Sequence, residues 1–178
     1  ILANAEGLAK YALLCQQANL VPIVEPEVLM SGIHTIDTSF DVTDRTLRTV
    51  FDQLEKHNVD LEGIVLKPNM VLSGYNCENQ ASVEEVAQKT LECLTKNVPS
   101  KVPGIAFLSG GQSDELATLH LNEINKHDTN WNVTFSYGRA LQQSALKIWA
   151  GKSENARAAQ ETVLSRAKSN SLASTASL

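Results

Sequence analysis

The feature that most constrains the fold is a fourfold alternation of short apolar runs with amphipathic segments. The apolar runs, each expected to form a β-strand, cover residues 21–25, 64–67, 104–108 and 132–137. Each run is followed by a stretch with helical periodicity or a helix-capping residue. Strands that alternate with helices usually pair in parallel through right-handed crossovers. The sequence therefore predicts an α/β fold with a parallel sheet.

Helical patterns fill the segments between these runs. They are expected at 4–17, 42–57, from 82 onward, at 113–126, from about 140 and at 154–168. Ser82 and Ser113 each stand where an N-cap is needed, with acidic residues in the following turn. The last ten residues, SNSLASTASL, are rich in serine and alanine and are expected to be mobile or loosely docked.

Composition excludes several classes of partner. With 178 residues, 43% of them hydrophobic, the chain can form one soluble domain with a substantial core. A net charge of −5 argues against nucleic acid or an anionic membrane as the main partner. No run approaches the ~18 apolar residues of a membrane span, and the opening residues lack the basic leader expected of a signal peptide.

The cysteines and histidines indicate neither disulfides nor a metal site. Cys15, Cys77 and Cys93 are odd in number and lack CxxC spacing, so they are expected to be reduced thiols in the cytosol. The four histidines match no metal-ligand pattern. We therefore expect no metal and no other cofactor.

Polar residues follow all four predicted strands. Glu25 and Lys67 close the first two strands, Ser109 follows the third, and Gly138 with Arg139 follows the fourth. Taken alone, Lys67 would more often be a snorkelling lysine at a strand end than a functional group. Four polar strand ends in succession favour a site, because α/β barrels hold their active sites at the carboxyl ends of parallel strands.

A partly desolvated lysine at such a position can act as a nucleophile. Its amine would attack a carbonyl carbon to form a Schiff base, whose protonated form is an electron sink. Proton transfers during imine formation require a carboxylic acid, for which Glu25 and Glu27 are candidates. The alternative for this pair is a solvated loop entrance.

Two glycine-containing turns are typical of a phosphate site. SGGQS, beginning with Ser109, Gly110 and Gly111, stands directly before a predicted helix, where bare backbone N–H groups and the helix dipole favour an oxyanion. SYGR contributes Ser136, Gly138 and the guanidinium of Arg139. Barrels commonly build a phosphate site after their last two strands.

These motifs resemble one family closely. VPIVEPE, LEGIVLKPNM, GIAFLSGGQS, LNEINK and TFSYGRALQQSALKIWAGK are similar to the class I, metal-free fructose-bisphosphate aldolases. The resemblance implies a (β/α)8 TIM barrel, usually a homotetramer. It also implies a cytoplasmic glycolytic enzyme that reversibly cleaves fructose 1,6-bisphosphate to dihydroxyacetone phosphate and glyceraldehyde 3-phosphate.

By matching motif, the resemblance assigns roles to the residues above. Lys67 would be the Schiff-base lysine, Glu25 the acid/base and Glu27 a supporting carboxylate. The resemblance also assigns the ketose phosphate to six residues: Ser109, Gly110, Gly111, Ser136, Gly138 and Arg139.

The chain also departs from the family pattern. Only four βα units are present where a barrel needs eight, so residues 1–150 are expected to form the C-terminal half of a barrel and 151–178 a C-terminal helix and the start of a mobile tail. The family's N-terminal aspartate, basic residues and terminal tyrosine have no counterpart here. Segment 30–40, MSGIHTIDTSF, diverges from the usual loop.

Three functions are therefore open. The first is a class I aldolase of which this chain alone is incomplete. The second is a non-catalytic half-barrel that binds other proteins, with cytoskeletal proteins among the partners that the resemblance implies. The third, less favoured by the motifs, is another Schiff-base lyase acting on a phosphorylated sugar.

Overall fold

The computed structural model describes residues 1–178 and contains one four-stranded parallel sheet. The strands are β1 (Ile23–Val24), β2 (Val65–Leu66), β3 (Gly104–Phe107) and β4 (Asn132–Phe135), and they lie in the order β1-β2-β3-β4. Val24 pairs with Leu66, and Ile105 pairs with Leu66 on one side and Val133 on the other. The predicted α/β class and parallel pairing are confirmed, although each strand is shorter than its apolar run.

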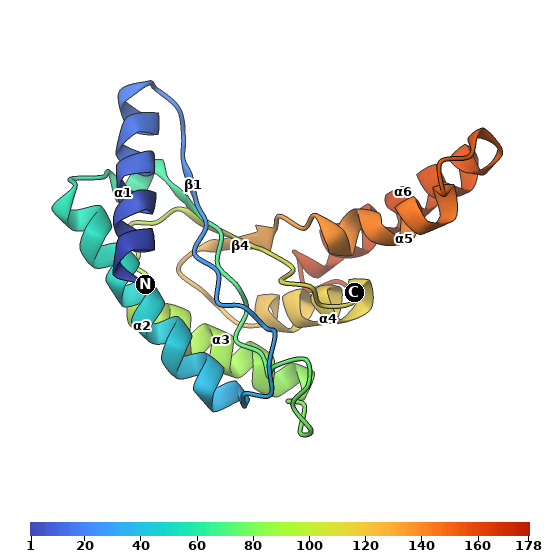
Figure 1. Ribbon diagram of the computed structural model, residues 1–178, viewed down its shortest axis with the longest axis horizontal. Coiled ribbons are helices and arrows are strands. Elements are labelled where there is room, and N and C mark those ends of the chain that lie inside the picture. The colour runs from blue at the N-terminus through green and yellow to red at the C-terminus, as the bar shows by residue number, and fades with distance from the viewer.

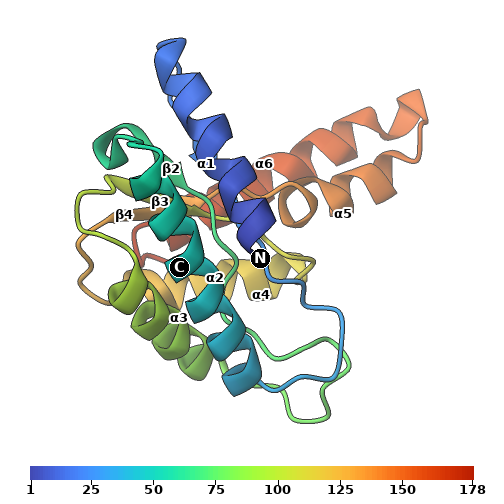
Figure 2. The same cartoon turned by 60° about the vertical axis from the view of Figure 1, so that its left-hand side comes forward.

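Six α-helices and two short 3₁₀ helices connect and flank the strands (Figure 1). They are α1 (Leu2–Gln17), α2 (Ile36–Lys56), η1 (Leu61–Gly63), α3 (Val83–Asn97), α4 (Asp114–Asn125), α5 (Arg139–Trp149), η2 (Ser153–Asn155) and α6 (Ala156–Ala173). Helices α5 and α6 pack together as a hairpin that projects from the rest of the molecule in both views (Figures 1 and 2). None of these helices combines the length and apolarity needed to cross a membrane.

Serine and threonine caps begin three of the helices. Ser82 Oγ accepts a hydrogen bond from the backbone N–H of Glu85 at 3.2 Å, and Ser113 Oγ accepts one from Leu116 at 3.2 Å, as the sequence predicts. Helix α2 begins at Ile36, six residues before the expected start, because Thr35 caps it by accepting from the N–H of Thr38 at 3.3 Å.

The two faces of the sheet have different surroundings. Val24, Leu66 and Ile105 are almost fully buried in the core that the strands share with the helices. On the opposite face, toward which Lys67 alternates, Ile23 and Thr134 are exposed and Val65 is partly exposed, whereas Ala106 is buried. Helices therefore cover one face more completely than the other.

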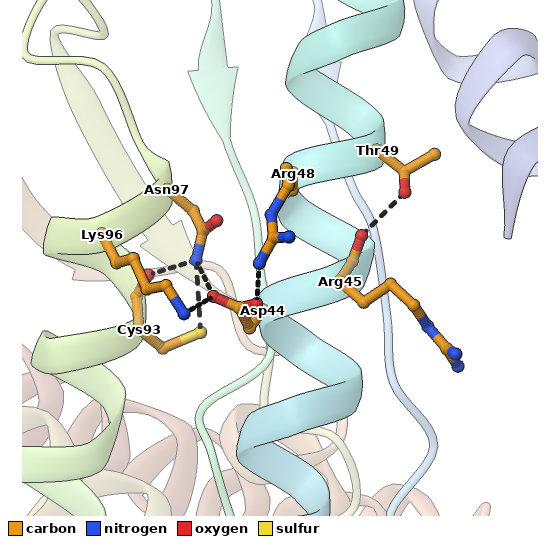
Figure 3. A network of polar contacts seen from close by, with 7 residues as sticks. All are labelled: Asp44, Arg45, Arg48, Thr49, Cys93, Lys96 and Asn97. Atoms are coloured by element: carbon orange, nitrogen blue, oxygen red, sulfur yellow. Dashed lines mark hydrogen bonds and ion pairs between the residues drawn. The ribbon is translucent and has the colours of Figure 1, made fainter.

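A polar cluster joins α2 to α3 (Figure 3). The buried carboxylate of Asp44 pairs with Lys96 at 2.8 Å and with Arg48, and it accepts from Asn97 Nδ2 at 2.9 Å. Burial alone would raise the pKa of Asp44. The hydrogen bonds from Lys96 and Asn97 and the charges of Arg48 and Lys96 outweigh burial and hold this pKa below its ordinary value.

The last residues of the chain contact helix α4. Helix α6 continues to Ala173, and Asn170 is fully buried where its Oδ1 accepts from Thr118 Oγ1 of α4 at 2.7 Å. The backbone N–H of Leu178 donates to Asn122 Oδ1 at 3.1 Å. These contacts join residues 52 and 56 positions apart, and no local pattern indicates them.

Candidate active site

The site is built around the end of β2. The backbone N–H of Lys67 donates to Val24 O at 2.8 Å and so extends the pairing of β1 with β2 by one step. The Nζ of Lys67 lies 3.1 Å from Oε1 of Glu25, and the lysine side chain is only 19% exposed. The amine and the carboxylate are therefore within direct proton-transfer distance at the carboxyl ends of neighbouring strands.

Glu27 lies near this pair but is not ion-paired with Lys67. Glu25 and Glu27 flank the buried Pro26, and all three line one cavity of about 520 Å³ that also borders α1 and α2. The backbone after Glu27 is fixed by Asn69, whose Oδ1 accepts from Val28 N at 2.9 Å. Asn69 thus ties the segment that carries both glutamates to the segment that carries Lys67.

The SGGQS segment forms a tight turn between β3 and α4. Ser109 is buried, and its carbonyl accepts from the N–H of Gln112 at 3.0 Å. Gly110 and Gly111 have φ values of 59° and 85°, in the left-handed region that residues with a Cβ rarely adopt. Their N–H groups donate to no protein acceptor, so both are available to a ligand.

Arg139 and Tyr75 meet at this turn. A Cβ on Gly111 would lie 3.3 Å from Nη1 of Arg139 and would collide with the hydroxyl of Tyr75. That hydroxyl donates a hydrogen bond to the carbonyl of Gly110. The guanidinium from the start of α5 is therefore directly beside the glycine turn that follows β3.

Ser136 and Gly138 hold the backbone that leads to Arg139. The N–H of Ser136 donates to Phe107 O at 2.8 Å and keeps the segment after β4 beside β3. Gly138 is the N-cap of α5, with open space around the position of a Cβ. The six residues predicted to hold phosphate thus lie on two neighbouring loops, with Arg139 in contact distance of Gly111.

Charged side chains from two loops of the site act on the pKa of Tyr75. Burial raises the pKa of Tyr75, the positive charge of Arg139 lowers it, and the negative charge of Glu27 raises it. The phenol therefore lies within electrostatic range of groups that follow β1 and β4, the two edge strands. Four loops contribute to one polar region at the carboxyl end of the sheet.

The other cavities have different linings. A groove of about 710 Å³ between α5 and α6 is mostly apolar and contains no ionisable side chain.

No group of three or more histidine, cysteine, aspartate or glutamate side chains is placed to hold a metal ion.

A lysine and a carboxylate in contact at two strand ends, followed by a glycine turn and an arginine at the next two, form an arrangement typical of the carboxyl ends of the strands in α/β barrels. The family model for class I fructose-bisphosphate aldolase matches residues 1–178, and the chain belongs to that family. The resemblance of the motifs is thereby confirmed.

Individual relatives support the assignment. The chain is 54% identical over 175 residues to a probable fructose-bisphosphate aldolase class 1 of Xanthomonas axonopodis pv. citri, covering 97% of this chain and 52% of that protein. It is 52% identical to the cytoplasmic isozyme of Spinacia oleracea, covering 96% of this chain and 48% of that one. The chain therefore spans about half the length of these relatives.

A solved structure gives the same result for the fold. A crystal structure of fructose-bisphosphate aldolase from Plasmodium falciparum, in complex with TRAP and a small-molecule inhibitor, matches with a TM-score of 0.94 and 49% identity. The match covers 97% of this chain and 50% of that one. The four βα units therefore correspond to part of the relative's fold.

Two residues of the site were missed by reasoning from the sequence. Asn69 could have been found, because a polar amide between apolar neighbours, as in LKPNMVL, is uncommon without a buried partner. Tyr75 gave no such signal, since it lies in a polar loop and meets Gly110 only through the fold.

Proposed function

We propose that this chain supplies four βα units of a class I fructose-bisphosphate aldolase, which reversibly cleaves fructose 1,6-bisphosphate through a Schiff base on Lys67. The contact of 3.1 Å between Lys67 Nζ and Glu25 Oε1 carries this proposal. An amine nucleophile with a carboxylic acid in direct reach is the pair that imine chemistry requires.

In this mechanism the amine of Lys67 attacks the ketone carbon of the substrate to give a carbinolamine. Glu25 donates a proton as the hydroxyl group leaves as water, and Glu27 supports the charge of this region. A base of the complete active site then takes the proton of the hydroxyl group at the carbon–carbon bond beta to the protonated imine; this bond breaks, its electron pair passes to the imine to give an enamine, and glyceraldehyde 3-phosphate leaves. Reprotonation and hydrolysis of the imine then release dihydroxyacetone phosphate and regenerate the amine.

The ketose phosphate is assigned to the two loops beside Lys67. The free N–H groups of Gly110 and Gly111, with Ser109 at the start of the turn, would accept the phosphate oxygens. Arg139 would add a charge-assisted contact, while Ser136 and Gly138 shape the loop that presents it. We propose the phosphorylated sugar as the ligand, a cytoplasmic location and a homotetrameric assembly of the complete enzyme.

The 178 residues alone are expected to be inactive. Strands β1 and β4 each pair with only one neighbour, and Ile23 and Thr134 are exposed on the face of the sheet that carries Lys67. Eight strands are needed to close a barrel of this class. A protein of residues 1–178 should therefore show no cleavage of fructose 1,6-bisphosphate, and turnover by a mass-verified sample would contradict this expectation.

The apolar groove between α5 and α6 favours a second candidate function. A half-barrel without cleavage activity could act as a protein-binding module, with cytoskeletal proteins as candidate partners. Such binding should then be retained by a Lys67→Arg variant, whereas the catalytic function requires the amine.

Borohydride trapping tests the principal proposal. Reduction in the presence of dihydroxyacetone phosphate should add the mass of the ligand less one oxygen atom to the peptide that contains Lys67, because imine formation releases water and reduction adds two hydrogens. The matched control is Lys67→Arg, which keeps the positive charge but cannot form an imine. Label on another lysine, with Lys67 unmodified in the full-length protein, would rule out the assignment.

A further inference from the structure

We propose that Tyr75 is a positioning residue that orients the Gly110–Gly111 peptide toward the ligand phosphate. The proposal rests on the assignment of this turn to phosphate under the proposed function. Tyr75 belongs to the loop between β2 and α3, so it would couple the strand that carries Lys67 to the turn that follows the next strand.

The backbone of Tyr75 is held by the loop that follows β1. Its N–H donates to Met30 O at 2.9 Å, and its neighbours Gly74 and Asn76 donate to His34 O and Gly32 O, each at 2.9 Å. These three hydrogen bonds join two loops of the site. The phenol of Tyr75 therefore extends from a well-fixed backbone.

The side chain then fixes one peptide group of the glycine turn. The Tyr75 hydroxyl donates to the carbonyl of Gly110. In a planar trans peptide the carbonyl and the next N–H point in opposite directions, so this bond directs the N–H of Gly111 away from Tyr75. That N–H has no protein acceptor, as a donor reserved for a ligand requires.

Packing around Gly111 supports the same role. A side chain at this position would collide with the Tyr75 hydroxyl and lie within 3.3 Å of Arg139 Nη1. Gly111 is therefore enclosed by the phenol and the guanidinium. The guanidinium and the oriented N–H can then converge on one anion.

The turn also needs this restraint because it is not fully packed. A cavity of about 260 Å³ borders Gly111, Gln112 and the buried His120 and is lined by Tyr75 itself. Glycines at positive φ have many accessible backbone conformations. Without the hydroxyl of Tyr75, the peptide group could rotate toward this space.

Tyr75→Phe in the full-length protein tests the inference, because it removes the hydroxyl and keeps the ring. The dissociation constant for dihydroxyacetone phosphate should rise about three- to tenfold, the range expected for one hydrogen bond. Binding of unphosphorylated dihydroxyacetone should be unchanged. Equal effects on the two ligands, or none on either, would overturn the assignment.

Tyr11→Phe is the matched control, since it removes a hydroxyl from an exposed tyrosine of α1. It should leave both dissociation constants as in the wild type. A loss of phosphate affinity as large as that of Tyr75→Phe would show a general effect of losing a hydroxyl and would contradict the proposal.

Backbone NMR relaxation separates this inference from the proposed function. The order parameters of the Gly110 and Gly111 amides should be lower in Tyr75→Phe than in the wild type or Tyr11→Phe, with or without ligand. Unchanged order parameters would overturn the positioning role. If the wild type bound the phosphorylated and unphosphorylated ligands equally, the proposed function would fail, while the order parameters would still decide the role of Tyr75 in the turn.

Discussion

The amine of Lys67 and the carboxylate of Glu25 meet at 3.1 Å because β1 and β2 end side by side in the same direction. The N–H of Lys67 bonds to Val24 O, the residue before Glu25, so the backbone pairing fixes both side-chain origins. The lysine is largely buried, whereas the Glu25 side chain is 46% exposed. Protons can therefore pass between solvent and Glu25 while the amine stays partly shielded.

Replacing Glu25 with glutamine should slow imine formation without removing phosphate affinity. Glutamine keeps the size of the side chain but cannot exchange a proton, and a positioned acid/base group typically contributes roughly 10²- to 10⁴-fold. The rate of borohydride-trappable complex formation with dihydroxyacetone phosphate should fall by that order in the full-length enzyme. A rate equal to the wild type would remove Glu25 from the mechanism.

Replacing Arg139 with alanine should weaken phosphate binding but not folding. One charge-assisted hydrogen bond is worth about 1.5–3 kcal/mol, so affinity for dihydroxyacetone phosphate should drop roughly ten- to a hundredfold. Arg139 is exposed and has no ion-pair partner, so the unfolding midpoint should stay near that of the wild type.

Arg45→Ala is the control for this variant, because Arg45 is also exposed on a helix and has no ion pair. It should leave both ligand affinity and stability unchanged. If Arg139→Ala weakened binding of unphosphorylated dihydroxyacetone as much as that of the phosphorylated ligand, Arg139 would not be a phosphate contact.

Local signals predicted the order of the helices and strands but not every boundary. Ser82 and Ser113 were identified as caps because the capping residue and the bonded N–H are three positions apart. The start of α2 was misplaced because the periodicity was counted only from Val42, although Ile36 and Phe40 continue the helical spacing back toward the cap Thr35.

Sequence reasoning could place those candidate residues that lie at the carboxyl ends of the strands. The contact between Lys67 and Glu25 could be anticipated because parallel strands bring their carboxyl ends together. The hydrogen bond of Tyr75 to Gly110 spans 35 residues, and that of Val28 to Asn69 spans 41. Such pairings depend on the final packing of whole βα units, which periodicity does not encode.

The buried His120 should make stability fall in mild acid. Burial lowers its pKa from 6.5 to about 4, and its Nδ1 donates to Gln112 Oε1 at 2.6 Å. Because the unfolded chain binds this proton more tightly, the free energy of unfolding should decrease as the pH drops from about 6.5 to about 4, by up to about 3 kcal/mol. Above pH 6.5 this contribution should be constant.

Denaturant titrations between pH 4.5 and 7.5 would measure this dependence. In His120→Gln the pH slope should be smaller than in the wild type. His127→Gln, which alters an exposed histidine beyond the end of α4, should retain the slope. A slope that persists unchanged in His120→Gln would assign the acid sensitivity to other groups.

Replacing Asp44 with asparagine should destabilise the contact between α2 and α3. The variant weakens the interactions of a buried carboxylate with Arg48, Lys96 and Asn97. Because Arg48 and Lys96 are about half exposed, we expect the free energy of unfolding to fall by only about 1–3 kcal/mol. Equilibrium unfolding at pH 7 would measure the difference, with the exposed Asp52→Asn as a control near zero.

The pH dependence of the stability difference between the wild type and Asp44→Asn gives a second test. The pKa of Asp44 is lowered in the folded state, so its stabilising contribution is present above the ordinary value of 3.8 and is lost as the pH falls through the folded pKa. The difference between wild type and Asp44→Asn should therefore shrink only below about pH 4. A difference that disappeared already between pH 6.5 and 4 would contradict this assignment.

The order of the strands has a consequence for how the polypeptide is made. The strands lie in the sheet in the order in which they occur in the chain. As synthesis proceeds, each new strand of this sheet therefore finds the strand that precedes it already available, and none of the four has to be inserted between two strands that have already paired. The sheet can grow unit by unit behind the ribosome, with each crossover helix covering its strand before the next emerges.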